Sequence, residues 1–363
     1  MNILIYLGHP AQYHFFKNII KDLINNHSVV VLIKTKDVLE KLLMNDGIDY
    51  VNIQTRNRKN TSISILLASF RRTIQVYKIA KHKKIDLLLG TDSSVAQAAF
   101  LLRKSAITTL EDDYNVISKL ANLTYPFTKT ILVPEVCSVG KWTEKKIGYQ
   151  GYMKLSYLHP KRFSPDVNIK NKYVKEDHYC LLRLAKLTAH HDKGINGLSV
   201  ELVFELIRLL SDKGITVYLS AEYLPDSRLE KYILKINQND IHHLLAYSTL
   251  LVSDSQSMSV EAAMLGVPSI RYSDFSGKIS VLEELEHKYR LTYGIRTDEP
   301  GKLIDQVNDI LRFNNIKSEF KKRQQKMLND KIDVAGFCAW FIENYPESAK
   351  VMHENPDYQY RFK

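Results

Sequence analysis

The chain has 363 residues, of which 45% are hydrophobic and 25% are charged, and its formal net charge at pH 7 is +11. This length exceeds one ordinary domain and suits two, and the apolar content is sufficient for a core in each. The positive charge fits an anionic substrate or a membrane surface. The sequence has no zinc-finger, helix-turn-helix or aromatic RNA-binding signature, so we expect no nucleic acid as a partner.

Three features bear on the compartment of the protein. Cys137, Cys180 and Cys338 lie far apart in apolar stretches, which is typical of buried thiols in a reducing compartment. Residues 1–8 read as a short apolar strand without the charged start and cleavage site of a signal peptide. No apolar run reaches the roughly 18–20 residues of a membrane span. We therefore expect a cytoplasmic protein, with peripheral contact at the inner face of the cell membrane left open.

The first part of the chain alternates apolar strands with amphipathic helices. The hydrophobic pattern predicts strands over residues 3–7, 28–34, 49–54, 85–89, 106–110 and 130–134. It predicts helices over residues 14–25, 38–45, 63–82 and 94–103. Such alternation predicts a mostly parallel sheet with helices on both faces.

The same pattern restarts after a turn-rich stretch. Strands are predicted over 179–184, 216–220, 250–253 and 269–272. Helices are predicted over 200–213, 226–236, 242–247, 261–265, 302–313, 316–329 and 334–344, and the charged residues 346–363 are expected to be loosely ordered. We expect an N-terminal Rossmann-like domain (1–150), a linker (151–172), a C-terminal Rossmann-like domain (173–333) and a final helix with a tail (334–363). This is an α/β fold of two doubly wound domains facing each other across a cleft.

The stretch from Leu250 to Ile270 is the most informative part of the sequence. An apolar strand leads into a serine cluster, a helical pattern follows, and Gly266 and Pro268 end it. A helix that starts directly after a strand presents free backbone N–H groups and a positive dipole end, which favour a phosphate. We place Glu261 on the first turn of this helix, where it could accept hydrogen bonds from a ribose. The alternative is an ordinary strand–helix unit with a serine cap.

Three loops of the first domain could carry chemistry. The loop after the first strand contains His9 and His14, and a histidine there could act as a general base or simply cap and start a helix. Asp92, after the strand that ends at Leu89, is better explained as a helix cap. Three carboxylates follow the strand that ends at Leu110, and we weigh a solvated loop equally against an acid/base group there: Glu111, Asp112 and Asp113.

The first loop of the second domain is basic. Its charged side chains would suit a diphosphate, although a basic surface loop is the simpler alternative. The candidates are Arg183, Lys186, His190 and Lys193. No second ligand cluster accompanies His190, so we expect no metal site.

Together these motifs resemble the GT-B superfamily of nucleotide-sugar enzymes. They are most similar to a bacterial and archaeal family of predicted glycosyltransferases of unknown substrate, over nearly the whole chain. The resemblance rests on Gly8-His9-Pro10, Leu110-Glu111-Asp112-Asp113, Tyr157-Leu158-His159-Pro160, His191-Asp192-Lys193-Gly194 and Glu261-Ala262-Ala263-Met264-Leu265-Gly266-Val267-Pro268.

Two related groups imply different activities. By resemblance to the peptidoglycan N-acetylglucosaminyltransferase group, Glu261 would bind ribose. By resemblance to the UDP-N-acetylglucosamine 2-epimerase group, Asp92, Glu111 and His190 would match catalytic positions. The chain departs from the epimerase group because Gln256-Ser257 replaces a Gly-Gly pair and two further motifs of that group are missing.

We expect a metal-independent glycosyltransferase without a cofactor that moves a sugar from a nucleotide-diphosphate sugar, UDP-linked by resemblance, to a glycan or lipid-linked acceptor in surface polysaccharide synthesis. The alternative is a 2-epimerase-like isomerase, and a nucleotide-sugar-binding regulator is the least favoured reading. The base would be His14 or one of the carboxylates Glu111, Asp112 and Asp113. The donor site would comprise Arg183, Lys186, His190, Lys193, Ser255, Gln256, Ser257 and Glu261.

Overall fold

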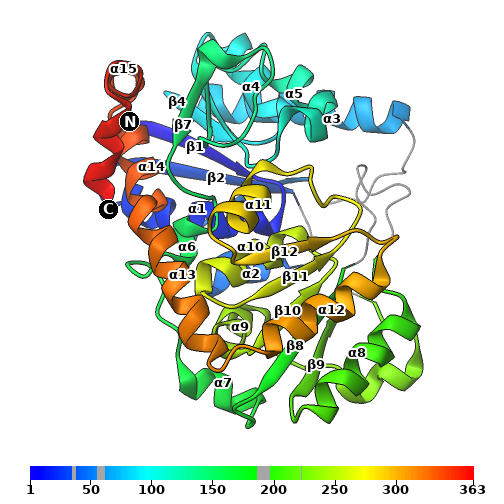
Figure 1. The fold of residues 1–363 in the computed structure, drawn as a ribbon. Helices are drawn as coiled ribbons and strands as arrows, with labels where there is room; N and C mark the ends of the chain where they lie inside the picture. The colour runs from blue at the N-terminus through cyan, green and yellow to red at the C-terminus, as the bar shows by residue number, and fades with distance from the viewer. Residues whose placement is uncertain (35–37, 55–61, 186–196, 222) are drawn as a thin grey trace. The chain divides into compact units, whose positions relative to one another are not determined.

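The computed structural model describes residues 1–34, 38–54, 62–185, 197–221 and 223–363, and for residues 62–66 the backbone only. The chain forms two compact units (Figure 1). Unit 1 contains residues 1–162 and 331–363, and unit 2 contains residues 163–330. The predicted linker, 151–172, is thus divided between the units, and the predicted C-terminal segment, 334–363, belongs to unit 1.

Unit 1 is built on a seven-stranded parallel sheet with the strand order β3-β2-β1-β4-β5-β6-β7. The central strand β1 is buried on both faces, since Ile3 to Leu7 have no exposed surface, and this explains its unbroken apolar sequence. The order reverses between β1 and β4, which is where open α/β sheets bind ligands. The strands are β1 (Asn2–Leu7), β2 (Ser28–Lys34), β3 (Val51–Gln54), β4 (Leu87–Gly90), β5 (Ser105–Thr109), β6 (Thr130–Pro134) and β7 (Lys146–Tyr149).

The helices of unit 1 alternate with these strands. The N-terminal ones are α1 (Pro10–Leu23), α2 (Leu39–Asn45), α3 (Ser62–His82), α4 (Ser93–Leu101), α5 (Tyr114–Thr124), η1 (Thr143–Lys145) and α6 (Leu155–Leu158). The C-terminal ones are α14 (Val334–Glu343), α15 (Glu347–Glu354) and η5 (Pro356–Phe362). Helix α1 begins at Pro10, four residues earlier than predicted, because His9 caps it and Pro10 suits the first helical position.

The end of the chain is ordered, contrary to the expectation of a loose tail. It returns to unit 1, where α14 packs against α1 (orange and blue in Figure 1). Gln359 is buried and its Oε1 accepts a hydrogen bond of 2.6 Å from the backbone N–H of Gln150. The rings of Trp340 and Tyr358 stack with centroids 4.6 Å apart. These contacts order residues whose charge pattern alone indicated a solvated tail.

Unit 2 is built on a five-stranded parallel sheet with the order β12-β11-β10-β8-β9. Its order reverses between β8 and β10, so the carboxyl ends of these two strands are the expected ligand position. The strands are β8 (Tyr179–Leu184), β9 (Thr216–Ala221), β10 (Leu250–Ser253), β11 (Ser269–Tyr272) and β12 (Thr292–Ile295).

The helices of unit 2 include one clear departure from the sequence pattern. The predicted helix over 226–236 is a short 3-10 helix, η2 (Ser227–Tyr232). The others are α7 (Val167–Tyr173), α8 (Val200–Asp212), η3 (Gln238–Asp240), α9 (Ile241–Tyr247), α10 (Gln256–Leu265), α11 (Ser280–Glu283), the π-helix η4 (Glu284–Lys288), α12 (Pro300–Leu311) and α13 (Ile316–Asp330).

Two further observations concern the described residues as a whole. Cys137, Cys180 and Cys338 are buried free thiols, as expected from their apolar surroundings. In the part of the chain that the structure describes, no helix has the length and apolar character to cross a membrane.

Candidate functional site

In unit 2, two arginines flank the end of the central strand β10. The strand register places Ser253 beside Arg183 of β8 on one side and beside Arg271 of β11 on the other. Residues that are paired in this way lie in one row across the sheet and point to the same face. The row lies at the carboxyl ends of the strands, at the switch point of this sheet. It therefore brings the predicted residue Arg183 close to the start of α10.

Helix α10 starts at Gln256, five residues before the predicted start. The hydroxyl of Ser253 accepts a hydrogen bond of 2.8 Å from the backbone N–H of Ser255, and Ser255 caps the helix by accepting from the N–H of Met258 at 3.5 Å. Gln256 and exposed Ser257 therefore occupy the first two helical positions rather than a loop. Their N–H groups have no partner within the helix, which makes this end suitable for an anion.

Glu261 lies on the second turn of α10, so its predicted place on the first turn is wrong. The reason is the serine cap, which starts the helix early. Glu261 lies four residues after Ser257, and such pairs share one face of a helix. Its carboxylate Oε1 is 3.5 Å from Nε2 of buried His242 on α9, an ion pair when that imidazole is protonated. The face of α10 with Ser257 thus also carries a carboxylate held by a neighbouring side chain.

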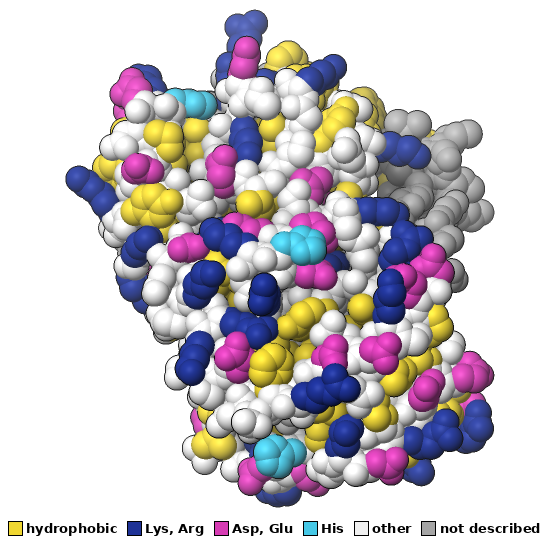
Figure 2. Space-filling view, viewed as in Figure 1, with side chains coloured by type: hydrophobic (Ala, Val, Ile, Leu, Met, Phe, Trp, Pro, Cys, Tyr) yellow, Lys and Arg dark blue, Asp and Glu magenta, His cyan; other side chains and the backbone are white. Residues whose placement is uncertain are grey.

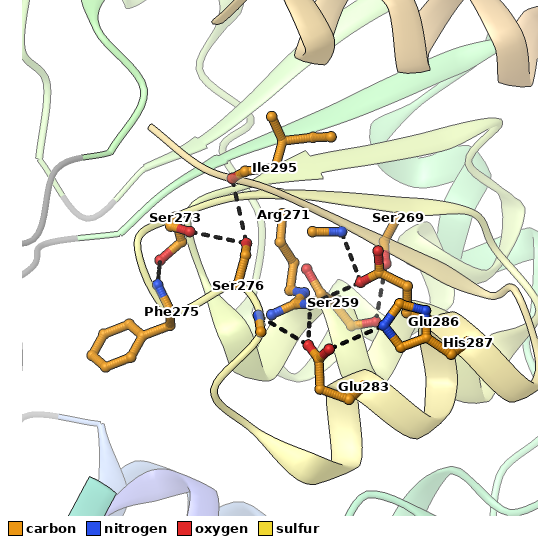
Figure 3. Close-up of polar contacts among 12 residues, drawn as sticks. Ser259, Ser269, Arg271, Ser273, Phe275, Ser276, Glu283, Glu286, His287 and Ile295 are labelled. Atoms are coloured by element: carbon orange, nitrogen blue, oxygen red, sulfur yellow. Dashed lines mark hydrogen bonds and ion pairs between the residues drawn. The ribbon is translucent and has the colours of Figure 1, made fainter. Parts of the chain in front are cut away.

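Arg271, which the sequence analysis did not single out, is fully buried. Figure 3 shows it close to Glu283 and Glu286. Its Nη1 donates to Oε1 of Gln256 at 3.0 Å, and its Nη2 lies 3.2 Å from Glu286 and 3.8 Å from Glu283. Burial lowers the pKa of the guanidinium, and the two carboxylates oppose that effect. A β-carbon at Gly294 would lie only 2.8 Å from Nη2. An arginine between Ile270 and Tyr272 in a predicted strand was the available sequence signal.

Asp254 is a second residue that the sequence analysis missed. It is buried at the end of β10, and its Oδ1 accepts a hydrogen bond of 2.7 Å from the backbone N–H of Ala185. Burial raises the pKa of Asp254 to about 6, although hydrogen bonds from the backbone of Ala185 and Leu198 and the charge of Arg183 lower it. A β-carbon at Gly197 would lie 2.6 Å from Oδ2. Asp254 thus ties β10 to the chain that leaves β8.

The remaining basic candidates can be placed only in part. Nη1 of Arg183 donates to the hydroxyl of Ser220 on β9 at 3.0 Å, so its side chain leans toward β9, on the side of β8 that faces away from β10. Lys186, His190 and Lys193 lie outside the described residues. Their predicted contact with a diphosphate stays a prediction.

In unit 1, the loops after β1 and β4 meet at the switch point of the sheet. Gln12 accepts a hydrogen bond of 2.6 Å from the backbone N–H of Gly8 and donates from its Nε2 to the hydroxyl of Thr91. His9 caps α1 by accepting from the N–H of Ala11 at 3.2 Å. Asp92 caps α4 and lies 3.4 Å from Nη1 of Arg72. The structural roles that the sequence offered for these two loops are therefore present.

His14, the candidate base, is half-buried on α1. Its ring lies 5.1 Å from that of Tyr13 and 5.2 Å from that of Tyr157 on α6, between centroids. The ammonium group of Lys17 lies 5.9 Å from the centre of the Tyr157 ring. The imidazole is thus held among aromatic rings next to a cation.

The three carboxylates after β5 have different surroundings. Glu111 accepts a hydrogen bond of 2.6 Å from the backbone N–H of Met153 and forms an ion pair with Lys154. Asp113 is buried and accepts a hydrogen bond of 2.8 Å from the N–H of Ser138. Asp112 is exposed. Glu111 contacts the segment 153–157, whose Tyr157 also lies against His14, so the structure brings these two candidates to one part of unit 1.

The described residues contain no group of three or more His, Cys, Asp or Glu side chains that could hold a metal ion. The residues gathered in unit 2 instead combine hydroxyls, amides and arginines with several carboxylates, of which Glu261 lies on α10 itself. These groups match the hydrogen-bonding needs of an anion and a diol.

No protein-family model matches the chain, and no curated protein sequence matches it. Solved structures do resemble it. The UDP-N-acetylglucosamine 2-epimerase from Neisseria meningitidis, bound to UDP-N-acetylglucosamine, aligns with a TM-score of 0.66 at 14% identity, over 96% of this chain and 100% of that one. The MnaA–UDP structure from S. aureus aligns with a TM-score of 0.68 at 15% identity, over 98% and 97%.

A glycotransferase of kitacinnamycin aligns as well, with a TM-score of 0.62 at 11% identity, over 94% of this chain and 98% of that one. At such identities the likeness concerns the fold. The chain has two parallel-sheet Rossmann-like domains of the GT-B class, as the sequence predicted.

Proposed function

We propose that this protein is an enzyme that acts on a nucleotide-diphosphate sugar and holds the nucleotide in unit 2. The observation that carries the proposal is the start of α10 at the carboxyl edge of the sheet, with Glu261 on the same helix. The N–H groups of Gln256 and Ser257 would receive the diphosphate, assisted by the hydroxyls of Ser255 and Ser257 and by Arg183. Lys186, His190 and Lys193 are the further candidates for that contact.

Glu261 would receive the ribose. It lies five positions beyond the first residue of the helix, or about 7.5 Å along the axis. That span is comparable to the span between the diphosphate and the ribose hydroxyls of a nucleotide. A carboxylate can accept both hydrogens of a diol, and His242 holds this one in place. UDP is the nucleotide favoured by the two structures described above, which were solved with UDP-N-acetylglucosamine and with UDP.

For the reaction, we propose an isomerisation of the 2-epimerase kind as the leading candidate. It is supported by the higher TM-scores of the epimerase and the UDP-bound protein than of the glycotransferase. Inversion at a sugar carbon needs one group to remove a proton and another to return it. Asp92, Glu111 and His190 are the candidates for this work.

The glycosyltransferase remains the second candidate, and a specific observation favours it. Asp92 caps a helix beside Arg72, and Glu111 accepts from a backbone N–H and pairs with Lys154. Two carboxylates that already serve the fold are less suited to exchanging protons. A transferase needs only one base, and His14 and Asp112 are the favoured candidates, since Asp113 is buried and also accepts from a backbone N–H. Its acceptor would be a glycan or a lipid-linked sugar. In either case we propose that no metal or organic cofactor takes part.

The deciding experiment incubates the purified protein with UDP-, GDP-, CMP- and dTDP-sugars without an acceptor, with and without a chelator, and follows the sugar by NMR. Formation of a 2-epimer would establish the isomerase. Tight binding of one donor without turnover would support the transferase and identify the donor for an acceptor search. If none of these sugars binds, the nucleotide site is wrong. Loss of activity with the chelator would contradict the metal-free proposal.

Replacement of the proposed ribose ligand gives the matching test of the site. We expect Glu261→Ala to weaken UDP binding about 10- to 100-fold, because hydrogen bonds to a charged group contribute about 1.5–3 kcal/mol. Glu205→Ala, an exposed glutamate on α8 of the same unit, is the control and should bind UDP as the wild type does. Calorimetric titration with UDP measures both. Equal affinity of a folded Glu261→Ala variant would contradict the assignment.

A further inference from the structure

Unit 1 exposes large apolar side chains on three helices that pack in sequence, α3 against α4 and α4 against α5. Phe70 on α3 and Leu101 on α4 are 64% and 61% exposed. Exposed apolar side chains that cluster on one surface indicate a binding site for another protein or for a membrane. We name this surface the α3–α5 face and define it by Leu67, Phe70, Ile74, Phe100, Leu101 and Leu123.

The spacing along α3 places its exposed residues in one stripe. Leu67, Phe70 and Ile74 follow one another at intervals of three and four residues, so they share one side of the helix. The same spacing continues to the exposed Lys78 and Lys81. The stripe is thus apolar in its first half and basic in its second.

The side chain of Gln97 forms hydrogen bonds to both neighbouring helices. Oε1 of Gln97 on α4 accepts a hydrogen bond of 3.1 Å from the hydroxyl of Thr73 on α3. Nε2 of the same amide donates to the carbonyl of Leu123 on α5 at 3.2 Å. Phe100 and Leu101 follow Gln97 by three and four residues and therefore lie on its side of α4. The side chain of Gln97 thus links α4 to both α3 and α5, the helices that carry the other exposed apolar residues of this face.

The helices of this face carry basic side chains and no acidic ones. The sequences of α3, α4 and α5 contain no Asp and no Glu. Exposed basic residues flank the apolar ones on each helix or directly after it, and they are Arg71, Lys78, Lys81, Arg103, Lys104 and Lys119. Over the side of the molecule that Figure 2 shows, Lys and Arg lie among Asp and Glu.

A hollow of about 290 Å³ continues this face at the end of α3 and after α4. Its walls include the side chains of Lys81, Lys84 and Lys104, and its apolar part includes Leu102, the residue after exposed Leu101. Asp86 lies there too and pairs with Lys104 at 3.5 Å. The hollow thus adds cationic groups at the edge of the apolar patch.

We propose that the α3–α5 face binds the surface of an anionic lipid bilayer. Apolar side chains that enter the headgroup region, surrounded by lysine and arginine, are the combination that peripheral membrane attachment requires. A second copy of this chain is a poorer occupant. A two-fold interface places each patch against itself, and here that would oppose lysine and arginine with lysine and arginine. Since this face belongs to unit 1, the proposal does not depend on the nucleotide site.

The test is flotation of the full-length protein with vesicles of phosphatidylcholine alone or with 30% phosphatidylglycerol, where the vesicle composition is roughly that of an anionic bacterial surface. We expect binding only to the anionic vesicles and a loss of binding at high salt. Phe70→Ser with Leu101→Ser should reduce binding about tenfold or more, because both apolar anchors are lost. Lys78→Gln with Lys81→Gln should reduce it to a similar extent.

Matched variants control for the number and type of substitutions. Met44→Ser with Val167→Ser removes two exposed apolar side chains from other helices, and Lys322→Gln with Lys326→Gln removes two exposed lysines from α13. Both should bind vesicles as the wild type does, and all variants should retain the wild-type melting temperature. Absence of vesicle binding by the wild type would overturn the proposal. So would unchanged binding by Phe70→Ser/Leu101→Ser, or a wild-type dimer that these two substitutions convert to a monomer.

Discussion

Two buried charged residues near the proposed anion site, Arg271 and Asp254, have partners within the protein. Arg271 has Glu283, Glu286 and Gln256 around it, and none of these contacts requires a ligand. Its effect on the site is indirect, because it holds the side chain of Gln256 at the first position of α10. Asp254 acts in the same way on the backbone that leaves β8. Both are positioning residues for the proposed anion site.

The raised pKa of Asp254 leads to a pH dependence of stability. Because burial raises this pKa from 3.8 to about 6, the folded protein binds the proton more tightly than the unfolded chain between these values. The contribution of Asp254 to the free energy of unfolding therefore decreases as the pH rises from about 4 to 6, by up to about 3 kcal/mol. The free energy of unfolding, measured by urea denaturation across this pH range, should decrease less for Asp254→Asn than for the wild type.

The control for this measurement is Asp212→Asn, which changes an exposed carboxylate at the end of α8. It should keep the pH dependence of the wild type. Identical curves for the wild type and Asp254→Asn would show that Asp254 titrates as it does in the unfolded chain.

Replacing Arg271 should destabilise the protein. Arg271→Met removes the cation that faces Glu283 and Glu286, and loss of one partner from a buried ion pair costs about 3 kcal/mol or more. Thermal unfolding followed by calorimetry measures the change. Arg296→Met is the control, because Arg296 pairs with Asp298 at the surface, and there we expect a change within about 0.5 kcal/mol. Equal stabilities of these two variants would contradict the role given to Arg271.

At the scale of single elements, α10 shows how a short helix can be placed accurately. Its start is set by the cap at Ser255, and its end by Gly266, whose φ of 72° lies in the left-handed region. Both ends lie next to strands, since β10 ends at Ser253 and β11 begins at Ser269. A shift of the helix by one residue would turn the face that Ser257 and Glu261 share toward another side. The cap residues are therefore as important to the site as the residues that would touch a ligand.

Substitution of Gly266 tests this placement. Gly266→Ala should destabilise the protein by about 1–2 kcal/mol, because the left-handed conformation disfavours a β-carbon. The added carbon would also lie 2.7 Å from Oε1 of Gln324. Gly301→Ala on α12 has open space around the new carbon and lies within a helix, so it should be neutral or stabilising by up to about 1 kcal/mol. Effects of the same sign and size at both positions would refute this explanation.

At the scale of the whole molecule, the chain crosses between its two units twice, near residue 162 and near residue 331. The second crossing returns the C-terminal segment to unit 1, where the backbone N–H of Ile332 donates to the carbonyl of Gln150 at 3.0 Å. The side chain of Arg162 joins in by pairing with Asp333 at 2.8 Å. Unit 1 is therefore complete only when the whole chain has been made, whereas unit 2 is one continuous segment.

A truncation tests this dependence. Removal of residues 346–363 takes away the ring that stacks on Trp340 and the amide that accepts from Gln150, so we expect the melting temperature of unit 1 to fall. UDP affinity, which we assign to unit 2, should remain within about twofold of the wild type as long as unit 2 stays folded. Tyr358→Phe, which keeps the stacked ring, is the control and should melt with the wild type. An unchanged melting temperature of the truncated protein would contradict the packing role of the tail.

The sequence predicted ten of the twelve strands in the described residues and missed two of the four edge strands. The strands β2, β6, β8, β10 and β11 have the predicted bounds. Strands β6 and β10 are buried throughout, which requires apolar runs, whereas β2 is buried only from Val31 to Ile33. The strands β7 and β12 were not predicted. Each is an edge strand of four residues with a glycine, KIGY and TYGI, and carries little of the hydrophobic signal. Helix α5 was missed as well, and it has a kink at Ile117 that interrupts its periodicity.

What the sequence determined by itself is local. The alternation of strands and helices, the two parallel sheets and the serine-capped helix after β10 all follow from patterns within a few residues. Only the tertiary structure decided which charges meet. Glu111 pairs with Lys154, 43 residues away, and Arg162 pairs with Asp333, 171 residues away. Such pairs depend on how the elements pack, because a buried charge is unfavourable unless it has a partner. No local sequence pattern encodes which residues will be paired.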